Sequence, residues 1–252
     1  MATALVTGAS AGIGAEFARQ LAACGYDLVA VARDEARLKS AAEGLGNVPV
    51  ELLPADLTTD EGCAVVADRI ADASRPVDVL VNNTGFATYR PFGTASLETE
   101  ERQLDLNVRA VLRLTHAAVR AMTSRGSGRI LNVSSVSAFV PRGGNATYSA
   151  SKAWVTMFSE SLAIQLAGTG VTVTAVCPGF THTEFHQRAN VDMSHVPQRM
   201  WLDAADVVRE ALEDTFAGKP SSIPSKRYKA LVGSAQALPR PALRAVMARR
   251  GM

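Results

Sequence analysis

A tyrosine and a lysine stand four residues apart, Tyr148 and Lys152, within the segment "NATYSASKAWV" at 145–155. On a helix, positions i and i+4 share a face, so the phenol and the ammonium would point the same way. Side chains of these types transfer protons when they line a pocket. On a surface helix they only extend their polar tips into solvent. The segment alone leaves both interpretations open, and the rest of the chain has to decide between them.

A glycine-rich loop, "TGASAGIG" at 7–14, joins an apolar run to a helical pattern. Gly8, Gly12 and Gly14 allow a tight turn, a close approach to a phosphate and close packing of a helix on a strand. The helix N-terminus would offer amides and a positive dipole end to a pyrophosphate. The glycine spacing departs from GxGxxG, and no Gly-Lys-Ser/Thr follows, so the loop is not a P-loop. An ordinary glycine-rich turn is the alternative, but the position between strand and helix favours a dinucleotide site.

The second apolar run ends with Ala32 and then Arg33. In dinucleotide-binding folds an acidic residue here binds both ribose hydroxyls and repels a 2′-phosphate. A guanidinium instead pairs with phosphate through parallel hydrogen bonds. The alternative is that Arg33 is solvated or pairs with Asp34 or Glu35 nearby. The residue types favour NADP(H) over NAD(H).

Strand-like apolar runs alternate with helix-like patterns along the chain. The runs cover residues 2–7, 27–32, 48–56, 77–83, 128–135 and 171–179, and the helical patterns cover 15–25, 34–46, 60–74, 97–125 and 148–168. The runs lack polar alternation, as strands of a parallel sheet do when helices cover both faces. Right-handed crossovers then give an α/β fold, a doubly wound parallel sheet of Rossmann type. We expect one such domain over residues 1–225 and a short basic amphipathic extension over 226–252.

Five motifs occur in order along these elements. They are "TGASAGIG" at 7–14, "NNTG" at 82–85, Ser135 thirteen residues before Tyr148, "YSASK" at 148–152 and "PGFTHT" at 178–183. Each is modest alone, but their joint occurrence over about residues 2–215 resembles the short-chain dehydrogenase/reductase family. The resemblance implies an NAD(P)-dependent oxidoreductase that acts on CH–OH groups. It favours a chemical role for the Tyr148–Lys152 pair over the surface interpretation.

The same resemblance implies a catalytic tetrad of Asn107, Ser135, Tyr148 and Lys152. Tyr148 would be the general acid in reduction, its pKa lowered from about 10 by the adjacent Lys152 ammonium, which also holds the nicotinamide ribose. Ser135 would stabilise charge on the substrate oxygen; Ser134 competes for this role, but the offset from Tyr148 selects Ser135. Asn107 would bend its helix and hold a water of the proton relay, although a helical asparagine can simply bond to backbone.

The resemblance also assigns residues to the cofactor. They are Gly8, Ser10, Gly12, Ile13, Gly14, Arg33, Asp56, Leu57, Asn83, Gly85, Tyr148, Lys152, Pro178, Thr181 and Thr183. Asp56 and Leu57 are expected at the adenine. Thr84 stands where the family usually has alanine, and its extra hydroxyl alters the contacts available there. Pro-Gly at 178–179 is also typical of an ordinary turn.

Residues 180–201 correspond to the family's substrate loop. Its Phe180, Phe185, Met193, Met200 and Trp201, with Phe86 and Phe139, are candidates for an apolar pocket. Such a pocket suits a bulky apolar ketone, aldehyde or secondary alcohol. The alternative is that these residues only dock the loop on the core.

The C-terminal region is basic. From Thr215 onward the chain has eight Lys or Arg and no acid, whereas the first 214 residues carry 18 basic and 24 acidic groups, a net charge of −6. A basic amphipathic tail suits peripheral contact with an anionic membrane or an acidic partner, and a solvated helix pair is the alternative. We expect no nucleic-acid partner. A non-catalytic NADP(H)-sensing or scaffold protein that works through this tail is the alternative function.

The tail replaces the Gly-Gly strand through which many family members form tetramers. A homodimer through the helices around 97–124 and 147–168 is therefore favoured over a tetramer. The scattered Cys24, Cys63 and Cys177 indicate small buried residues of a reducing compartment, and His116, His182, His186 and His195 lack zinc spacing, so no metal is expected. Without an N-terminal signal peptide or a membrane-length apolar run, a cytoplasmic location is expected.

Overall fold

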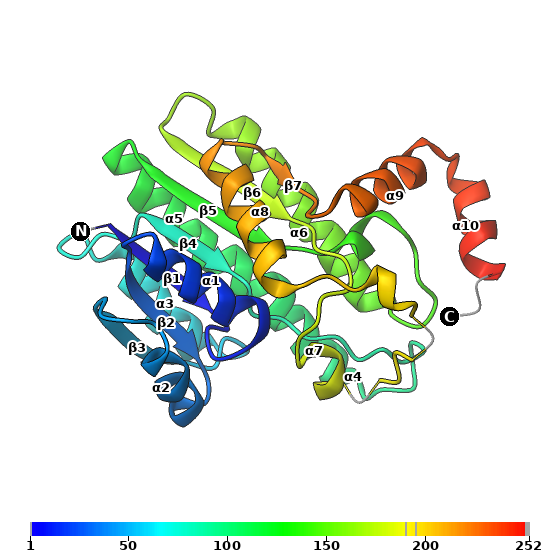
Figure 1. Cartoon of the computed structure of the whole chain (residues 1–252), viewed down its shortest axis with the longest axis horizontal. Coiled ribbons are helices and arrows are strands. Elements are labelled where there is room, and N and C mark those ends of the chain that lie inside the picture. Colours follow the sequence, from blue (N-terminus) through cyan, green and yellow to red (C-terminus); the bar gives the residue numbers. More distant parts are fainter. Residues whose placement is uncertain (1, 190, 195, 250–252) are drawn as a thin grey trace.

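The computed structural model describes residues 2–189, 191–194 and 196–249, apart from the side chains of His186 and Arg249. His195, one of the four histidines, and Arg250, one of the basic residues of the C-terminal region, lie outside the described residues. Within the described part, the protein is built on one sheet with helices on both of its faces (Figure 1). This confirms the predicted doubly wound α/β class.

The described strands form a seven-stranded parallel sheet in the order β3-β2-β1-β4-β5-β6-β7. The strands are β1 (Thr3–Thr7), β2 (Asp27–Ala32), β3 (Val50–Pro54), β4 (Val79–Asn82), β5 (Gly128–Val133), β6 (Val171–Val176) and β7 (Ser221–Ser222). The order reverses between β1 and β4, because the chain moves outward to β3 and returns to the other side of β1. A crevice for a ligand opens at the carboxyl ends of the strands beside such a reversal.

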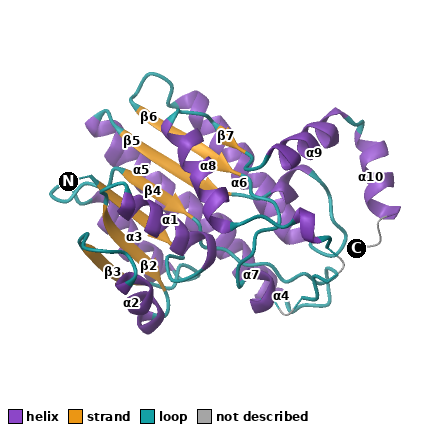
Figure 2. Ribbon diagram, in the orientation of Figure 1, coloured by secondary structure: helices purple, strands orange, loops and turns teal. Residues whose placement is uncertain are grey.

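Helices cover the two faces of the sheet in separate groups (Figure 2). One face carries α1 (Gly12–Ala23), α2 (Glu35–Glu43) and α8 (Ala204–Phe216), and the other carries α3 (Asp60–Ala71), α5 (Ala110–Arg125) and α6 (Ala146–Gln165). Further helices lie at the carboxyl ends of the strands or beyond them: α4 (Leu97–Leu104), α7 (Phe185–Arg188), α9 (Lys226–Ala237) and α10 (Arg240–Arg249). The helix α8 has no counterpart among the helical patterns expected from the sequence.

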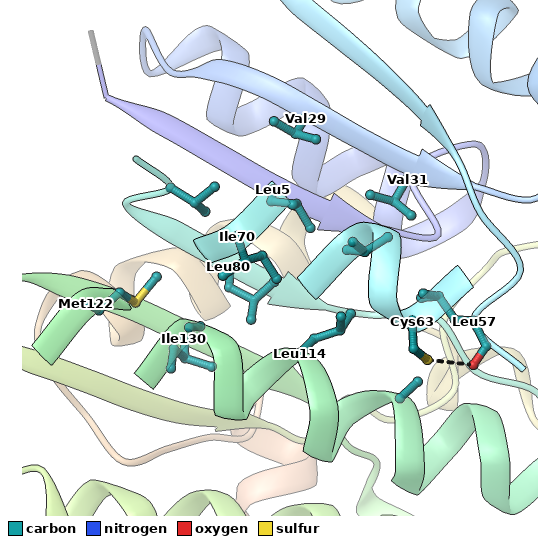
Figure 3. Packing of buried hydrophobic residues seen from close by; sticks show 14 of the residues in the cluster. Leu5, Val29, Val31, Leu57, Cys63, Ile70, Leu80, Leu114, Met122 and Ile130 are labelled. Atoms are coloured by element: carbon teal, nitrogen blue, oxygen red, sulfur yellow. Dashed lines mark hydrogen bonds between the residues drawn. The ribbon is translucent and has the colours of Figure 1, made fainter. Parts of the chain in front are cut away.

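Two apolar cores explain why the strand runs show no polar alternation. On β1, Leu5 belongs to the core beneath α3 and α5, whereas Val6 belongs to the core beneath α1 and α8. Figure 3 shows the first core, where Leu5 and Leu80 from the sheet approach Leu114 of α5. Successive strand residues point to opposite faces, so each must be apolar when both faces are covered.

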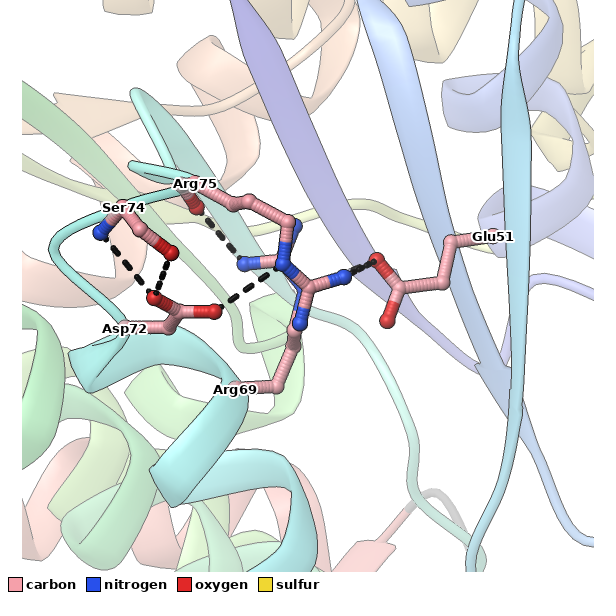
Figure 4. Close-up of polar contacts among 5 residues, drawn as sticks. All are labelled: Glu51, Arg69, Asp72, Ser74 and Arg75. Atoms are coloured by element: carbon pink, nitrogen blue, oxygen red, sulfur yellow. Dashed lines mark hydrogen bonds and ion pairs between the residues drawn. The ribbon is translucent and has the colours of Figure 1, made fainter.

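A buried guanidinium fixes the turn between α3 and β4 (Figure 4). Arg69 binds Glu51 of β3 at 2.8 Å and donates to the Arg75 carbonyl at 2.7 Å. Asp72 accepts hydrogen bonds from Ser74 and pairs with Arg75 at 2.9 Å, and these contacts lower the pKa of Asp72 to about 2. The cluster ties the edge strand to the segment that leads into β4, whose carboxyl end lies at the crevice.

The long helical region predicted at 97–125 contains a π-helical turn. The α-helix α4 ends at Leu104, residues Asp105–Arg109 form the π turn, and α5 continues to Arg125. A π turn inserts an extra residue into one helical turn and is frequent at functional sites. Asn107 lies in the middle of this turn and is fully buried.

Cys24 is exposed rather than buried, because it follows the last residue of α1 at the helix end. Residues 226–249 form two helices, as expected for the extension, and α9 packs on the main domain through Tyr228 and Val232. The domain limit at residue 225 stays a prediction. Among the described residues, none of the helices has the length and apolarity needed to cross a membrane.

Candidate active site

A cavity of about 740 Å³ opens at the carboxyl ends of β1, β2, β4, β5 and β6. The predicted residues that line it are Gly8, Ser10, Gly12, Ile13, Arg33, Leu57, Asn83, Gly85, Ser135, Tyr148, Lys152, Pro178, Thr181 and Thr183. Gly14, Asp56 and Asn107 are not in the wall and contact residues that are. The structure therefore brings the five sequence motifs together in one crevice.

The glycine loop packs closely against the end of β4. Gly8 has a φ of +69°, in the left-handed region that favours glycine, and a Cβ there would come within 2.7 Å of the Asn83 amide. A Cβ at Gly14 would collide with the Gly8 carbonyl. Ala11 at the N-cap provides no side-chain acceptor, so the first amides of α1 lack an internal partner. This glycine cradle at a helix N-terminus fits the pyrophosphate of a dinucleotide.

Thr7 joins the two strands on either side of the reversal. Its hydroxyl accepts hydrogen bonds from the amides of Asn83 and Thr84 at 2.9 and 3.1 Å, and its carbonyl accepts from the Asn83 side chain at 3.0 Å. These bonds fix the chain that leaves β4. They hold Gly85 in the cavity wall, where a larger residue would meet Asn107 at 2.9 Å and Lys152 at 3.5 Å.

The adenosine end of the cavity is rich in arginine. Arg33 lines the wall and makes no ion pair within the described part of the chain, so the alternative pairing with Asp34 or Glu35 is not observed. Asp34 instead caps α2 by accepting from the Arg37 amide at 3.0 Å. Burial disfavours the charged form of Asp56, but hydrogen bonds from Thr58 and the charge of Arg33 outweigh it and lower its pKa. The positive charge near the ribose position is therefore available to an anion.

The two serines at the end of β5 have different partners. The Ser134 hydroxyl donates to the Lys152 carbonyl at 2.7 Å and lies 2.7 Å from the Thr156 hydroxyl, both buried. The Ser135 hydroxyl accepts from the Ser137 amide at 3.1 Å and lies in the cavity wall with Tyr148, whose pKa it acts to lower. The geometry thus supports the choice of Ser135 over Ser134 for contact with a substrate.

Tyr148 and Lys152 lie on one face of α6, as their spacing predicts. The Lys152 ammonium lies 5.6 Å from the centre of the Tyr148 ring and donates to the Val133 carbonyl at 2.7 Å. Burial lowers the pKa of Lys152 to about 8. Burial, followed by the neighbouring Tyr89, raises the pKa of Tyr148, and the hydrogen bond with Ser135 only partly opposes this. The expectation of a lowered Tyr148 pKa is therefore wrong in direction, because burial dominates and the ammonium bonds to the backbone.

Asn107 connects the π turn to the catalytic helix. Its amide donates to the Phe86 carbonyl at 2.9 Å and to the Ser151 hydroxyl at 3.3 Å, and its carbonyl oxygen accepts from the Phe86 amide at 3.1 Å. The same oxygen faces Gly85, which stands between it and Lys152. Asn107 is thus placed beside the site, and its role in a water relay stays a prediction.

The substrate end of the cavity is aromatic and includes residues that sequence reasoning missed. Tyr89 has a φ of +49° and lies 6.3 Å from the Tyr148 ring and 6.4 Å from the Phe185 ring. Burial raises the pKa of Tyr89 to about 12. Arg142 also lines this end and stacks over Phe180 at 5.5 Å. Both residues lie in irregular segments, where no periodicity reveals which way a side chain points.

Part of the expected apolar wall lies behind the cavity. Phe86, Phe180 and Phe185 line it, whereas Phe139, Met193, Met200 and Trp201 are outside its wall. Trp201 packs on Phe180 at 5.8 Å and on His182 at 4.8 Å. It therefore supports the loop, which agrees with the alternative that some of these residues only hold the loop in place. Among the described residues, no three His, Cys, Asp or Glu side chains gather as a metal site would require.

The substrate loop is anchored on α9. The Tyr228 hydroxyl accepts from the Phe180 amide at 3.1 Å and donates to the Met200 carbonyl at 2.7 Å. Its ring lies against Gly179, where any Cβ would overlap it. Leu202 adds a bridge to Thr181, with its amide bonded to the Phe180 carbonyl at 2.8 Å. The C-terminal extension therefore holds both ends of this loop.

A parallel sheet with a glycine cradle at a helix N-terminus is typical of dinucleotide-binding proteins. Ser135, Tyr148 and Lys152 beside the cradle are groups that can transfer a proton, as an oxidoreductase requires. A family model for short chain dehydrogenases matches residues 2–194. An acetoacetyl-CoA reductase of Acinetobacter sp. (strain RA3849) is 38% identical over 184 residues, which cover 71% of this chain and 74% of the relative. This chain belongs to the short-chain dehydrogenase family and is an oxidoreductase that acts on CH–OH groups.

Solved structures show the same relationship. A short-chain dehydrogenase from Sphingobium yanoikuyae, in complex with NADPH, is 35% identical with a TM-score of 0.85 and covers 95% of this chain and 97% of its own. A bulky-bulky ketone specific alcohol dehydrogenase from Comamonas testosteroni is 31% identical with a TM-score of 0.80, covering 95% and 96%. The similarity extends through the C-terminal region, beyond the match to the family model.

Proposed function

We propose that this protein reduces an apolar ketone or aldehyde to its alcohol with NADPH. The observation that carries the proposal is the convergence of Ser135, Tyr148 and Lys152 on one cavity beside the glycine cradle. The aromatic side chains of Tyr89 and Phe185 around Tyr148 suit an apolar carbon skeleton. The alcohol dehydrogenase from Comamonas testosteroni, whose name refers to bulky ketones, supports this substrate class.

In this mechanism the chain binds the carbonyl oxygen and supplies a proton. When bound, NADPH supplies the hydride for the carbonyl carbon. The Ser135 hydroxyl donates a hydrogen bond to the carbonyl oxygen and stabilises its developing charge. Tyr148 gives its proton to that oxygen. Lys152 provides positive charge beneath the Tyr148 ring and hydrogen-bond donors for the ribose, and Asn107 holds the Phe86 backbone and Ser151, the neighbours of Gly85 and Lys152 in the chain.

The protonation state of Tyr148 suits the reduction step. Burial keeps the Tyr148 phenol protonated, which is the form that a general acid needs. Oxidation of an alcohol would need the phenolate, which the buried environment disfavours. The NADP(H)-sensing or scaffold alternative lacks support, because the chain belongs to a family of oxidoreductases and retains a proton-transfer pair in its cavity.

The experiment that tests the function is turnover of NADPH, with NADH in parallel, against medium-chain, aromatic and steroid-like carbonyls. We expect NADPH consumption that depends on a carbonyl and ranks bulky apolar ketones first. The matched alcohols are measured with NADP+ in the same assay. The proposal fails if NADPH binds and neither a carbonyl nor an alcohol of the panel reacts.

Arg33→Asp is expected to reverse the cofactor preference. The variant exchanges a phosphate-binding guanidinium for a carboxylate that repels the 2′-phosphate, so kcat/KM for NADPH should fall about 100-fold while that for NADH rises. The measurement is the ratio of the two kcat/KM values. Arg37→Asp is the matched control, because Arg37 is engaged with Glu184 at 2.7 Å. An unchanged ratio in Arg33→Asp would mean that the phosphate is recognised elsewhere.

We also propose that the protein forms a homodimer through α5 and α6. Both helices expose large apolar side chains, with Leu112 44%, Met157 67% and Ile164 80% exposed. An exposed apolar surface of this kind indicates an interface. The exposed basic side chains of Lys226, Arg227, Lys229, Arg240 and Arg244 lie on a different part of the molecule, which extends from its body (Figure 1). Contact with an anionic membrane there stays a prediction.

The double substitution Met157→Glu and Ile164→Glu is expected to give monomers. Two buried carboxylates would have to lose their hydration at the interface, which costs several kcal/mol. Light scattering after size-exclusion chromatography measures the mass of both proteins. Leu231→Glu on α9, which replaces a side chain 47% exposed, is the control and should remain dimeric. A dimeric mass for the double variant would place the interface elsewhere.

A further inference from the structure

Arg142 contributes a positive charge to the substrate end of the cavity. It lies six residues before Tyr148, in the loop that leads into α6, and it is half-buried in the cavity wall. It shares the cavity wall with Tyr89 and Tyr148, and its charge opposes the rise that burial causes in the pKa of both phenols. The guanidinium therefore lies in the same cavity as the group that would protonate a substrate.

The guanidinium of Arg142 has no acidic partner. Within the described residues it makes no ion pair and its Nε donor, which is buried, has no hydrogen-bond acceptor. Stacking on Phe180 stabilises the face of the guanidinium and does not use the Nε–H donor at its edge. A partly buried charge with unsatisfied donors is costly, and an anion that accepts from the edge would remove that cost.

Two other arginines of the cavity wall, Arg37 and Arg188, are already engaged. Glu184, in the substrate loop, binds both of them at 2.7 Å each. Arg33 follows β2, whereas Arg142 follows β5, and β1 and β4 lie between these two strands in the sheet. An anionic group near Tyr148 would thus meet Arg142 without competition from the residues at the adenosine end.

We propose that Arg142 determines specificity by binding a carboxylate carried by the apolar carbonyl substrate. The inference rests on the proposed function, because it assumes that the carbonyl oxygen is at Ser135 and Tyr148. The carbon skeleton would then lie against Tyr89 and Phe185, with its acidic end on the edge of the guanidinium. Two parallel hydrogen bonds from a guanidinium recognise a carboxylate in a fixed orientation. The substrate class is an oxo acid with an apolar body.

The test is a series of aryl ketones that end in a carboxylate at increasing chain length, each paired with its methyl ester. The kcat/KM with NADPH is measured for the wild type, Arg142→Met and Arg142→Lys. We expect the wild type to prefer the best acid over its ester by about 10- to 100-fold, the effect of a charged hydrogen bond. Arg142→Met should remove this preference by lowering the value for the acid, with the ester changed less than about threefold. Arg142→Lys should keep part of the preference for the acid, because lysine keeps the positive charge but cannot form two parallel hydrogen bonds.

A second measurement separates this inference from the proposed function. The same acids are titrated calorimetrically into the wild type and Arg142→Met, each saturated with NADP+. Two outcomes would overturn the carboxylate site and leave the reductase intact. One is that Arg142→Met loses activity equally for acid and ester. The other is that the wild type reduces the esters and shows no preference for the acids. Acid binding that depends on Arg142 in a protein that reduces no ketone would instead refute the reductase and retain the site.

Discussion

Tyr148→Phe is expected to lower kcat for carbonyl reduction about 1,000-fold, within the range that a general acid contributes. The substitution removes the proton donor and keeps the ring, which packs at 6.1 Å from Phe185 and 6.3 Å from Tyr89. The affinity for NADPH should therefore remain within about threefold of the wild type, as for a residue that acts in the transition state. Stopped-flow reduction and a fluorescence titration of NADPH measure the two quantities.

Tyr89→Phe is the matched control for this prediction. Tyr89 also lines the cavity, and its phenol is a second candidate for the role of acid. We expect this variant to keep most of its activity, because Ser135, which would bind the carbonyl oxygen, interacts with Tyr148. If Tyr89→Phe were inactive and Tyr148→Phe active, the proton would come from Tyr89 and the proposed mechanism would be wrong.

Lys152→Met is expected to lower kcat/KM by at least about 100-fold, through loss of the positive charge that stabilises the reacting groups. In the wild type, kcat/KM for reduction should decline as the pH rises through about 8, because the buried ammonium then loses its proton. The variant should lack this decline. A pH profile of both proteins is the measurement, and a wild-type profile that stays flat to pH 10 would contradict the assignment.

The same variant is expected to be more stable than the wild type at neutral pH. Burial lowers the pKa of Lys152 from 10.5 to about 8, so the folded protein binds fewer protons than the unfolded chain between these values. The wild type therefore carries its full burial penalty below pH 8, about 3 kcal/mol, and loses the penalty as the pH rises to 10.5. Loss of the hydrogen bond to Val133 offsets about 1 kcal/mol of the stability that the variant gains by removing this penalty.

Urea unfolding at pH 7 and at pH 10 tests this expectation. The free energy of unfolding of Lys152→Met should exceed that of the wild type by about 2 kcal/mol at pH 7, and the difference should shrink at pH 10. Lys152→Arg is the control, because arginine stays charged and so keeps the penalty at both pH values. A less stable Lys152→Met at pH 7 would show that the lysine is not held at an energetic cost.

The fold was predictable because its signals are local and repeated. Apolar runs such as 27–32 need no knowledge of distant residues, and glycine punctuation marks the ends of their helices. The helix α8 was also within reach, since Val207, Val208, Ala211 and Leu212 recur at helical spacing and are buried. The π turn was not predictable, because Asn107 at its middle exchanges hydrogen bonds with the backbone of Phe86, which is 21 residues away in the chain.

The site was predictable where a motif fixed both a residue and its position. Tyr148 and Lys152 share a helix, so their spacing alone places them together. Arg142 and Tyr89 lie in loops, and their contacts exist only after the strands have assembled. The pKa of Tyr148 was misjudged for a related reason: sequence proximity to Lys152 is visible, whereas the extent of burial is a property of the whole cavity.

The hydroxyl of Tyr228, which bonds to Phe180 and Met200 at once, has a consequence for how this enzyme can diversify. A segment whose entry and exit are fastened at one point can change in length and composition without straining the sheet beneath it. The segment between Phe180 and Met200 can therefore be exchanged as one unit. Grafting the corresponding segment of a relative should transfer substrate preference while the cofactor half of the cavity keeps its affinity, provided that Gly179, Thr181, Thr183 and Tyr228 are retained.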